Sequence, residues 1–168
     1  MKHTISVIVE NKPGVLHRVS GMFSRRGFNI ESLAVGTTAK PNVSRMTIVV
    51  TGDDLVLEQI TKQLYKQIDV LKVFDIPDVE AIDRELILVK VKITDKKDLN
   101  EITKLAEMFQ GKVVNVTPES AILEVSAEKE KIEDLQKLLD KFGIIELVRT
   151  GKIALQKGDI PRNPKAKK

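Results

Sequence analysis

Residues 10–33 of the chain, ENKPGVLHRVSGMFSRRGFNIESL, hold the pattern that decides the fold. Apolar residues alternate just before this stretch, which predicts a strand over residues 2–10. Inside the stretch they recur at helical spacing after the Pro-Gly pair, which predicts a helix over residues 14–26. A second strand is predicted over residues 28–38. The stretch therefore connects two strands through one helix, with Gly14 at the start of that helix.

The rest of the sequence completes this unit and then repeats its order. The first half continues with a predicted strand 43–51, helix 53–67 and strand 70–77. The second half reads strand 84–93, helix 96–110, strands 112–117 and 120–126, helix 128–142 and strand 144–156. The order βαββαβ is typical of a ferredoxin-like four-stranded antiparallel sheet with two helices on one face. We therefore predict an α+β fold of two tandem ferredoxin-like domains, residues 1–78 and 84–158.

Two features of this plan predict self-association. Because helices cover one face of the first sheet, the other face is expected to be bare and to include apolar residues such as Ile8 and Val49, and exposed apolar strips usually have a partner. Strands 28–38 and 70–77 form edges with unpaired backbone groups. We expect a homodimer formed by sheet extension. The buried side of helix 53–67 is predicted to comprise Leu57, Ile60, Leu64 and Ile68.

Composition excludes several classes of function. Of 168 residues, 42% are hydrophobic and 31% are charged, which is typical of soluble globular proteins. The chain has no cysteine, so a disulfide framework, a thiolate nucleophile and a cysteine-bound metal are excluded. The first residues lead into a strand rather than into a targeting segment. We expect a cytoplasmic protein that has no membrane association and no metal or cofactor of its own.

The formal net charge of +4 arises at the C-terminal end. Arg162, Lys165, Lys167 and Lys168 lie in the last seven residues, and without them 24 basic residues balance 24 acidic ones. Residues 159–168 are predicted to be a basic disordered tail. The charge of the body therefore gives no indication of nucleic-acid binding.

A free amino acid has a carboxylate, an ammonium group and a side chain, and residues 10–33 offer a group for each. Backbone N–H groups of residues 14–16 could receive the carboxylate, and Gly14 allows close approach because it has no Cβ. The side-chain amides of Asn11 and Asn29 can donate to the carboxylate or accept from the ammonium group. On spacing alone, however, an ordinary loop and a turn residue are the favoured interpretation. Candidate walls for a branched aliphatic side chain are Val15, Leu16 and Ile30.

Three short segments of the sequence resemble those of a known protein family. They read Val-Glu-Asn-Lys-Pro-Gly-Val-Leu at 9–16, Arg-Arg-Gly-Phe-Asn-Ile-Glu-Ser-Leu at 25–33 and Ser-Arg-Met-Thr-Ile-Val-Val at 44–50. The first resembles the ACT domain, an amino-acid-sensing module of metabolic enzymes. The second and third are more specific. With them, the whole chain resembles the small, regulatory subunits of acetolactate synthase, also called acetohydroxyacid synthase.

This resemblance implies a non-catalytic regulatory subunit in branched-chain amino acid biosynthesis. It implies that the protein activates the catalytic subunit and confers feedback inhibition by valine. Catalysis, with thiamine diphosphate, magnesium and FAD, is then expected on the catalytic subunit. The resemblance also implies an ACT-domain dimer with the effector at its seam, and it places Asn11, Gly14 and Asn29 on valine-binding positions.

Other functions fit the sequence less well. A stand-alone ACT sensor with another enzyme partner is the alternative, but a generic ACT module lacks a second domain such as residues 84–156. RNA-recognition domains share the βαββαβ order and stack bases on aromatic residues of two central strands, yet the corresponding strands here have no aromatic residue. Glycine-rich phosphate-binding motifs are also absent from the sequence. His3 and His17 are interpreted as structural or exposed.

Overall fold

The computed structural model describes residues 1–158, so the predicted tail at 159–168 lies outside the described residues. The chain forms two compact units. The described part of the first comprises residues 1–82 and 152–158, and the second comprises residues 83–151. The first unit thus includes a C-terminal segment that the sequence assigned to the second domain.

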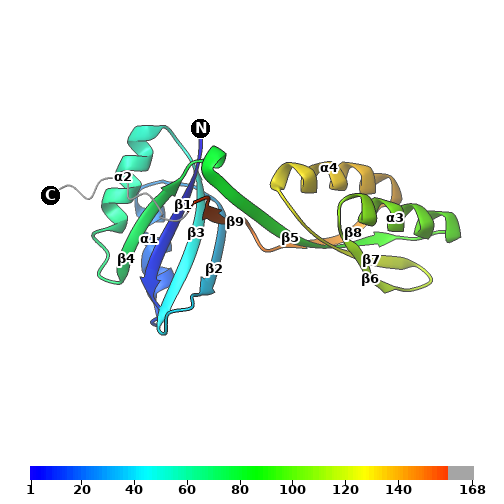
Figure 1. The fold of residues 1–168 in the computed structure, drawn as a ribbon, viewed down its shortest axis with the longest axis horizontal. Coiled ribbons are helices and arrows are strands. Elements are labelled where there is room, and N and C mark those ends of the chain that lie inside the picture. The colour runs from blue at the N-terminus through cyan, green and yellow to red at the C-terminus, as the bar shows by residue number, and fades with distance from the viewer. Residues whose placement is uncertain (159–168) are drawn as a thin grey trace. The chain divides into compact units, whose positions relative to one another are not determined.

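The first unit has the predicted βαββαβ order (Figure 1). Its elements are β1 (Lys2–Glu10), α1 (Val15–Arg25), β2 (Ile30–Thr37), β3 (Val43–Thr51), α2 (Asp54–Leu64) and β4 (Val70–Ile76), followed by a 3-10 helix, η1 (Asp78–Glu80). The strands form an antiparallel sheet in the order β2-β3-β1-β4. The ferredoxin-like plan is confirmed, with β2 and β4 as the two edges of this sheet.

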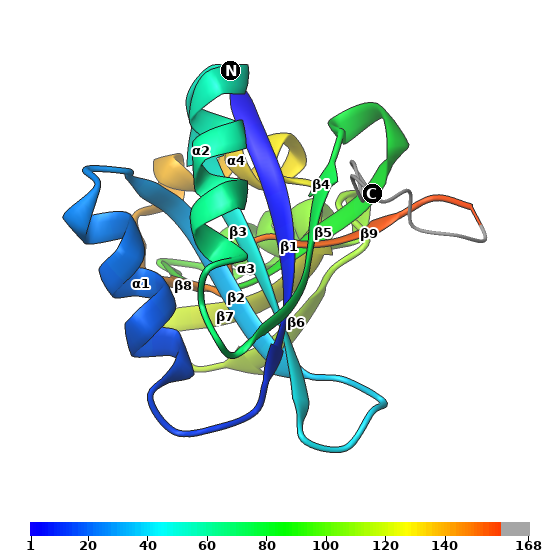
Figure 2. The same ribbon diagram turned by 90° about the vertical axis from the view of Figure 1, so that its left-hand side faces the viewer.

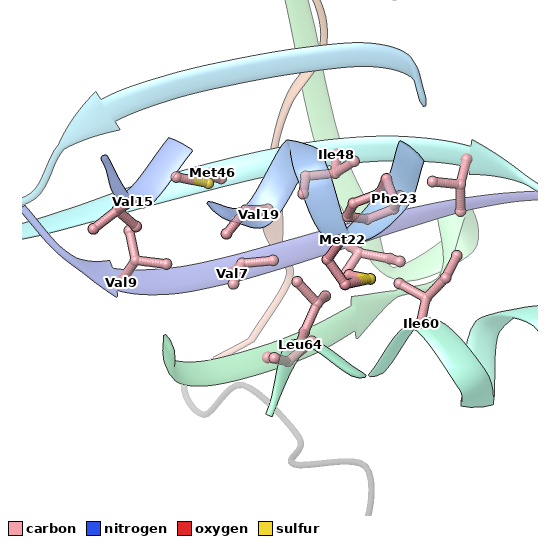
Figure 3. Packing of buried hydrophobic residues seen from close by; sticks show 13 residues of the cluster. Val7, Val9, Val15, Val19, Met22, Phe23, Met46, Ile48, Ile60 and Leu64 are labelled. Carbon is pink, nitrogen blue, oxygen red and sulfur yellow. The ribbon is translucent and has the colours of Figure 1, made fainter. Parts of the chain in front are cut away.

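The core of this unit lies between the sheet and its two helices, which cover one side of it (Figure 2). Figure 3 shows side chains of α1, including Val19 and Phe23, packed against β1 and β3. Burial of each such side chain contributes roughly 1.5–3 kcal/mol to stability. The buried cluster comprises Ile5, Val7, Val9, Val15, Val19, Met22, Phe23, Met46, Ile48, Val50, Ile60, Leu64 and Val73.

Helix α2 is shorter than predicted. Asp53 caps its start by accepting a hydrogen bond from the Val56 N–H at 2.9 Å, and the helix ends at Leu64. Ile60 and Leu64 are fully buried as predicted, but Ile68 is 91% exposed. The prediction for Ile68 is wrong because the helical period stops at Leu64, so the next apolar position no longer faces the sheet.

The second unit repeats the architecture with its own core. Its elements are β5 (Ala81–Lys92, which begins in the first unit), α3 (Lys96–Met108), β6 (Lys112–Val116), β7 (Ser120–Ala127), α4 (Lys129–Leu139), a 3-10 helix, η2 (Asp140–Phe142), and β8 (Ile144–Arg149). The strand order is β6-β7-β5-β8. Asp95 caps the start of α3, because its Oδ1 accepts hydrogen bonds from the N–H groups of Lys97 and Asp98.

The prediction of one continuous strand over residues 144–156 is wrong. It is divided into β8 and β9 (Ile153–Gln156), with Gly151 between them at a φ of 82°. A residue with positive φ cannot continue an extended strand, and glycine adopts this conformation without steric cost. β9 then pairs with β5, and the Lys157 N–H donates to the Glu80 carbonyl at 2.7 Å.

The returning segment covers part of the first sheet on the face opposite the helices. Ala154 of β9 is 6% exposed, and the Lys152 N–H donates to Ser32 Oγ at 2.9 Å. The prediction that this face of the sheet is exposed to solvent at Ile8 and Val49 is therefore wrong. Ile8 is partly buried, and Val49 is 7% exposed. The cluster on this face comprises Phe74, Ile76, Ala81 and Ala154, with Ile8 packed against it.

Gly111 gives a stability prediction for the second unit. A Cβ at this position would clash with the Val125 side chain and would lie 2.6 Å from the Glu124 carbonyl oxygen. Gly111→Ala should therefore lower the free energy of unfolding by about 1–3 kcal/mol, as expected for overpacking. Gly36→Ala is the control, because a Cβ there meets nothing within 4 Å. Urea unfolding measures the stability of both variants, and equal unfolding midpoints would contradict the prediction.

Asp75 of β4 gives a pH-dependence prediction. Burial raises the pKa of Asp75 above its ordinary value near 3.8; the nearby His3 opposes this shift, and Asp54 and Asp78 add to it. The folded state favours the neutral acid, so protonation of Asp75 stabilises the fold. This contribution to the free energy of unfolding is fully present below pH 3.8 and is lost as pH rises through the folded pKa. Asp75→Asn should thus have a higher melting temperature than the wild type at pH 7. This advantage should disappear under acidic conditions in which wild-type Asp75 is protonated, and a constant difference across the pH range would refute the assignment.

Candidate functional site

The candidate site is built on the turn between β1 and α1, residues 11–14. The Asn11 N–H donates to the Asn42 carbonyl at 2.8 Å, which ties this turn to the connection between β2 and β3. Gly14 has a φ of 83°, in the left-handed region, and is the N-cap residue of α1. It turns the chain into the helix but has no side chain with which to cap it.

The start of α1 leaves hydrogen-bond donors open. The Val15 N–H is engaged in the turn, where it donates to the Lys12 carbonyl at 3.4 Å. Within residues 1–158, the N–H groups of Leu16 and His17 donate to no backbone acceptor. Together with the positive end of the helix dipole, such donors favour an anion. Of the predicted carboxylate donors, Leu16 is therefore better placed than Val15.

Sequence reasoning missed a charged pair beside this turn. Arg18 Nε donates to Asp69 Oδ2 at 2.8 Å, and Arg18 Nη2 lies 2.6 Å from the same oxygen. Asp69 is 6% exposed. A Cβ on Gly14 would lie 2.9 Å from Arg18 Nη1, so the guanidinium group lies directly against the turn. The sequence feature that could have indicated this pair is a cation, Arg18, in the first turn of a helix, where the helix dipole disfavours positive charge.

A second ion pair lies on the exposed side of the same turn. Lys12 Nζ is 2.5 Å from Glu10 Oε2. The hydrogen bond to Glu10 raises the pKa of Lys12 above its ordinary value. Water screens an exposed pair of this kind, so it stabilises the turn only weakly.

The three predicted wall residues have different environments. Val15 is 4% exposed and belongs to the core under α1, and Ile30 packs against the same core from β2. Leu16 is 45% exposed. Of these three residues, Leu16 is thus the one whose side chain is available to a ligand at the turn.

Asn29 lies at the other end of α1 from Asn11. β1 ends opposite Val43 of β3, whereas β2 begins opposite Val50. These positions are seven residues apart along an extended strand, and each asparagine lies one residue beyond them, so the two asparagines are separated by more than roughly 20 Å. Figure 2 shows the loop that follows β1 and the segment that enters β2 at opposite ends of α1. A single chain therefore does not bring Asn11 and Asn29 together.

Other classes of site find no support in the described residues. Within residues 1–158, no group of three or more His, Asp or Glu side chains could hold a metal ion. No helix in this part of the chain is long and apolar enough to cross a membrane. His17 is exposed, and His3 Nε2 is buried without a hydrogen-bond partner.

Similarity to known proteins covers both units. Residues 5–72 match the family described as "AHAS small subunit-like ACT domain", and residues 84–158 match the one described as "Small subunit of acetolactate synthase". The probable acetolactate synthase small subunit of Archaeoglobus fulgidus is 50% identical over 95% of this chain and 99% of its own length. That of Methanothermobacter thermautotrophicus is 49% identical over 93% of each chain.

A solved structure agrees with these relatives. The crystal structure of the acetolactate synthase small subunit from Thermotoga maritima has a TM-score of 0.89 and 40% identity to this chain, and the match covers 95% of this chain and 99% of that one. Sequence and fold therefore agree over both units. The chain belongs to the family of acetolactate synthase small subunits, and its first unit is an ACT domain.

Proposed function

We propose that the protein is the regulatory subunit that binds the thiamine-diphosphate-dependent catalytic subunit of acetolactate synthase, activates it and confers inhibition by valine. The observation that carries the proposal is the match to small subunits over residues 5–72 and 84–158. A stand-alone ACT sensor would not account for the second unit. The catalytic chemistry is assigned to the partner, together with its thiamine diphosphate, magnesium and FAD.

The valine site is proposed to form between two copies of the chain, because one chain cannot present Asn11 and Asn29 to a molecule as small as an amino acid. β2 is an edge strand. If two β2 strands pair antiparallel about a two-fold axis, the start of one lies beside the end of the other. The end of β2, where Thr37 pairs with Ser44, is near Asn42, whose carbonyl accepts the Asn11 N–H. Such a dimer would bring Asn29 of one copy toward Asn11 of the other.

Each group of the effector would then have a counterpart at this seam. The open N–H groups at the start of α1 would face the carboxylate. The amides of Asn11 and of the second copy's Asn29 would bind the polar end of the amino acid. The exposed Leu16 would contact its branched aliphatic side chain.

Regulation would follow from linkage between the two binding events. Valine at the seam would favour one arrangement of the two ACT domains, and the catalytic subunit must bind the possible arrangements with different affinity. By reciprocity, the catalytic subunit must change the affinity for valine by the same factor by which valine changes its binding.

The test of the proposed function is acetolactate formation by the matching catalytic subunit, measured with and without this protein across a valine titration. We expect activation that valine reverses. Absence of activation at every subunit ratio would refute the regulatory-subunit assignment. Activation that valine leaves unchanged would refute valine as the effector while the subunit assignment stands.

A mixing experiment tests whether the site is shared between copies. Asn11→Ala and Asn29→Ala should each weaken valine inhibition, since every site in either homodimer lacks one amide. When the two variants are unfolded and refolded together, a mixed dimer regains one site with both asparagines. Valine sensitivity should therefore recover in part.

The control for this experiment is Asn100→Ala, a change at an exposed asparagine of α3 in the second unit. Alone, it should have wild-type valine sensitivity. Mixed with Asn29→Ala, it should show the sensitivity of its own intact copies whether or not the chains exchange, so the extent of exchange is measured separately as the fraction of mixed dimers by native mass spectrometry. If the Asn11→Ala and Asn29→Ala mixture showed no recovery despite exchange, the shared site would be excluded.

A further inference from the structure

We propose that Arg18 binds the carboxylate of the effector and that Asp69 is the positioning residue that holds Arg18 for this role. The inference rests on the proposed function, because it concerns the same turn at the start of α1. It adds a charged contact that the sequence motifs did not identify.

Asp69 fixes one edge of the guanidinium group. The Asp69 side chain is 9% exposed, and its Oδ2 lies 2.8 Å from Arg18 Nε and 2.6 Å from Nη2. Asp69 is itself held just before β4, because its carbonyl accepts the Glu10 N–H at 2.9 Å. Hydrogen bonds between charged groups are short and strong, so this pair restricts the orientation of the planar guanidinium.

The other edge of the guanidinium group faces the turn. The contacts with Asp69 use Nε and Nη2, and within residues 1–158 Arg18 Nη1 donates no hydrogen bond. Nη1 lies beside Gly14, at 2.9 Å from the position that a Cβ would occupy, and the Arg18 side chain is 44% exposed. An arginine presented in this way suits a carboxylate better than a lysine would, because its donors are fixed in a plane.

The location of this charge is difficult to explain by stability alone. A cation in the first turn of a helix interacts unfavourably with the helix dipole. Placing Asp69 in a buried position also costs desolvation that an ion pair often fails to offset. Lys12, a second cation in the loop before α1, is already paired with Glu10. Arg18 therefore supplies positive charge with an open edge where the helix N–H groups are also open.

Gly14 is required twice in this arrangement. Its positive φ favours glycine for conformational reasons. A Cβ at this position would also lie 2.9 Å from Arg18 Nη1, so a side chain here would displace the guanidinium edge. The glycine therefore allows the guanidinium group to lie against the turn.

The experiment compares two ligands that differ at the carboxylate. L-Valine and L-valinamide share the side chain and the amino group, but valinamide has a neutral amide in place of the carboxylate. Calorimetric titration of the full-length protein should show valine binding much more tightly than valinamide. In Arg18→Gln, we expect the affinity for valine to fall by about tenfold or more, the scale of one lost charged hydrogen bond, with little change for valinamide. A merely structural role of Arg18 would weaken both ligands by the same factor.

Two further variants keep the test independent of folding defects. Arg18→Gln leaves the buried Asp69 without its partner, so Arg18→Gln/Asp69→Asn removes both charges together. The double variant should show the same loss of preference for valine over valinamide. Lys62→Gln on α2, an exposed cation paired with Glu58, is the matched control and should bind both ligands as the wild type does.

The outcomes separate the two proposals. If the wild type binds valine and both Arg18 variants retain its preference over valinamide, Arg18 is not the carboxylate contact, although the proposed function stands. If the wild type does not bind valine, the proposed effector is wrong and this inference fails with it. Loss of the preference in both Arg18 variants, with Lys62→Gln unchanged, supports the inference.

Discussion

A helix that connects two parallel strands must run back along the sheet, and this constraint determines the geometry of the candidate site. In the first unit, β1 and β2 are both antiparallel to β3 and are therefore parallel to each other. α1 lies across them because Val15, Val19, Met22 and Phe23 are buried against the sheet. The turn at Gly14 and the entry to β2 at Asn29 are thereby held at opposite ends of the helix. Two polar groups of one sequence motif consequently cannot meet within one copy of the chain.

The same constraint connects ligand binding to association. A site that needs both ends of α1 is complete only when a second copy supplies the missing end, and β2 is available as an edge for that purpose. An effector at such a seam contacts two chains at once, so its binding energy depends on how the chains are arranged. Under the proposed function, binding of an amino acid at this seam would therefore favour one arrangement of the two chains.

The charges around the turn fit this interpretation. Asp69 is far from Arg18 in sequence, yet it positions the guanidinium group of Arg18 beside Gly14. The C-terminal segment shows a comparable long-range effect, since Ala154 completes an apolar cluster on the opposite face of the same sheet. The ACT unit therefore includes residues from both ends of the described chain.

The sequence by itself determined the order of the elements, the helix-facing core and the family, because these depend on local patterns. Alternation and helical spacing identify the buried faces of β1 and α1, and Asp53 and Asp95 cap their helices where the sequence places acidic residues. The tertiary structure decided which of these local features meet. It separated Asn11 from Asn29, paired Arg18 with a carboxylate 51 residues away, and returned β9 to the first unit. The physical reason is that spacing along a chain reports which face a residue occupies, whereas distance across a sheet depends on strand order and on how far the chain runs before it turns.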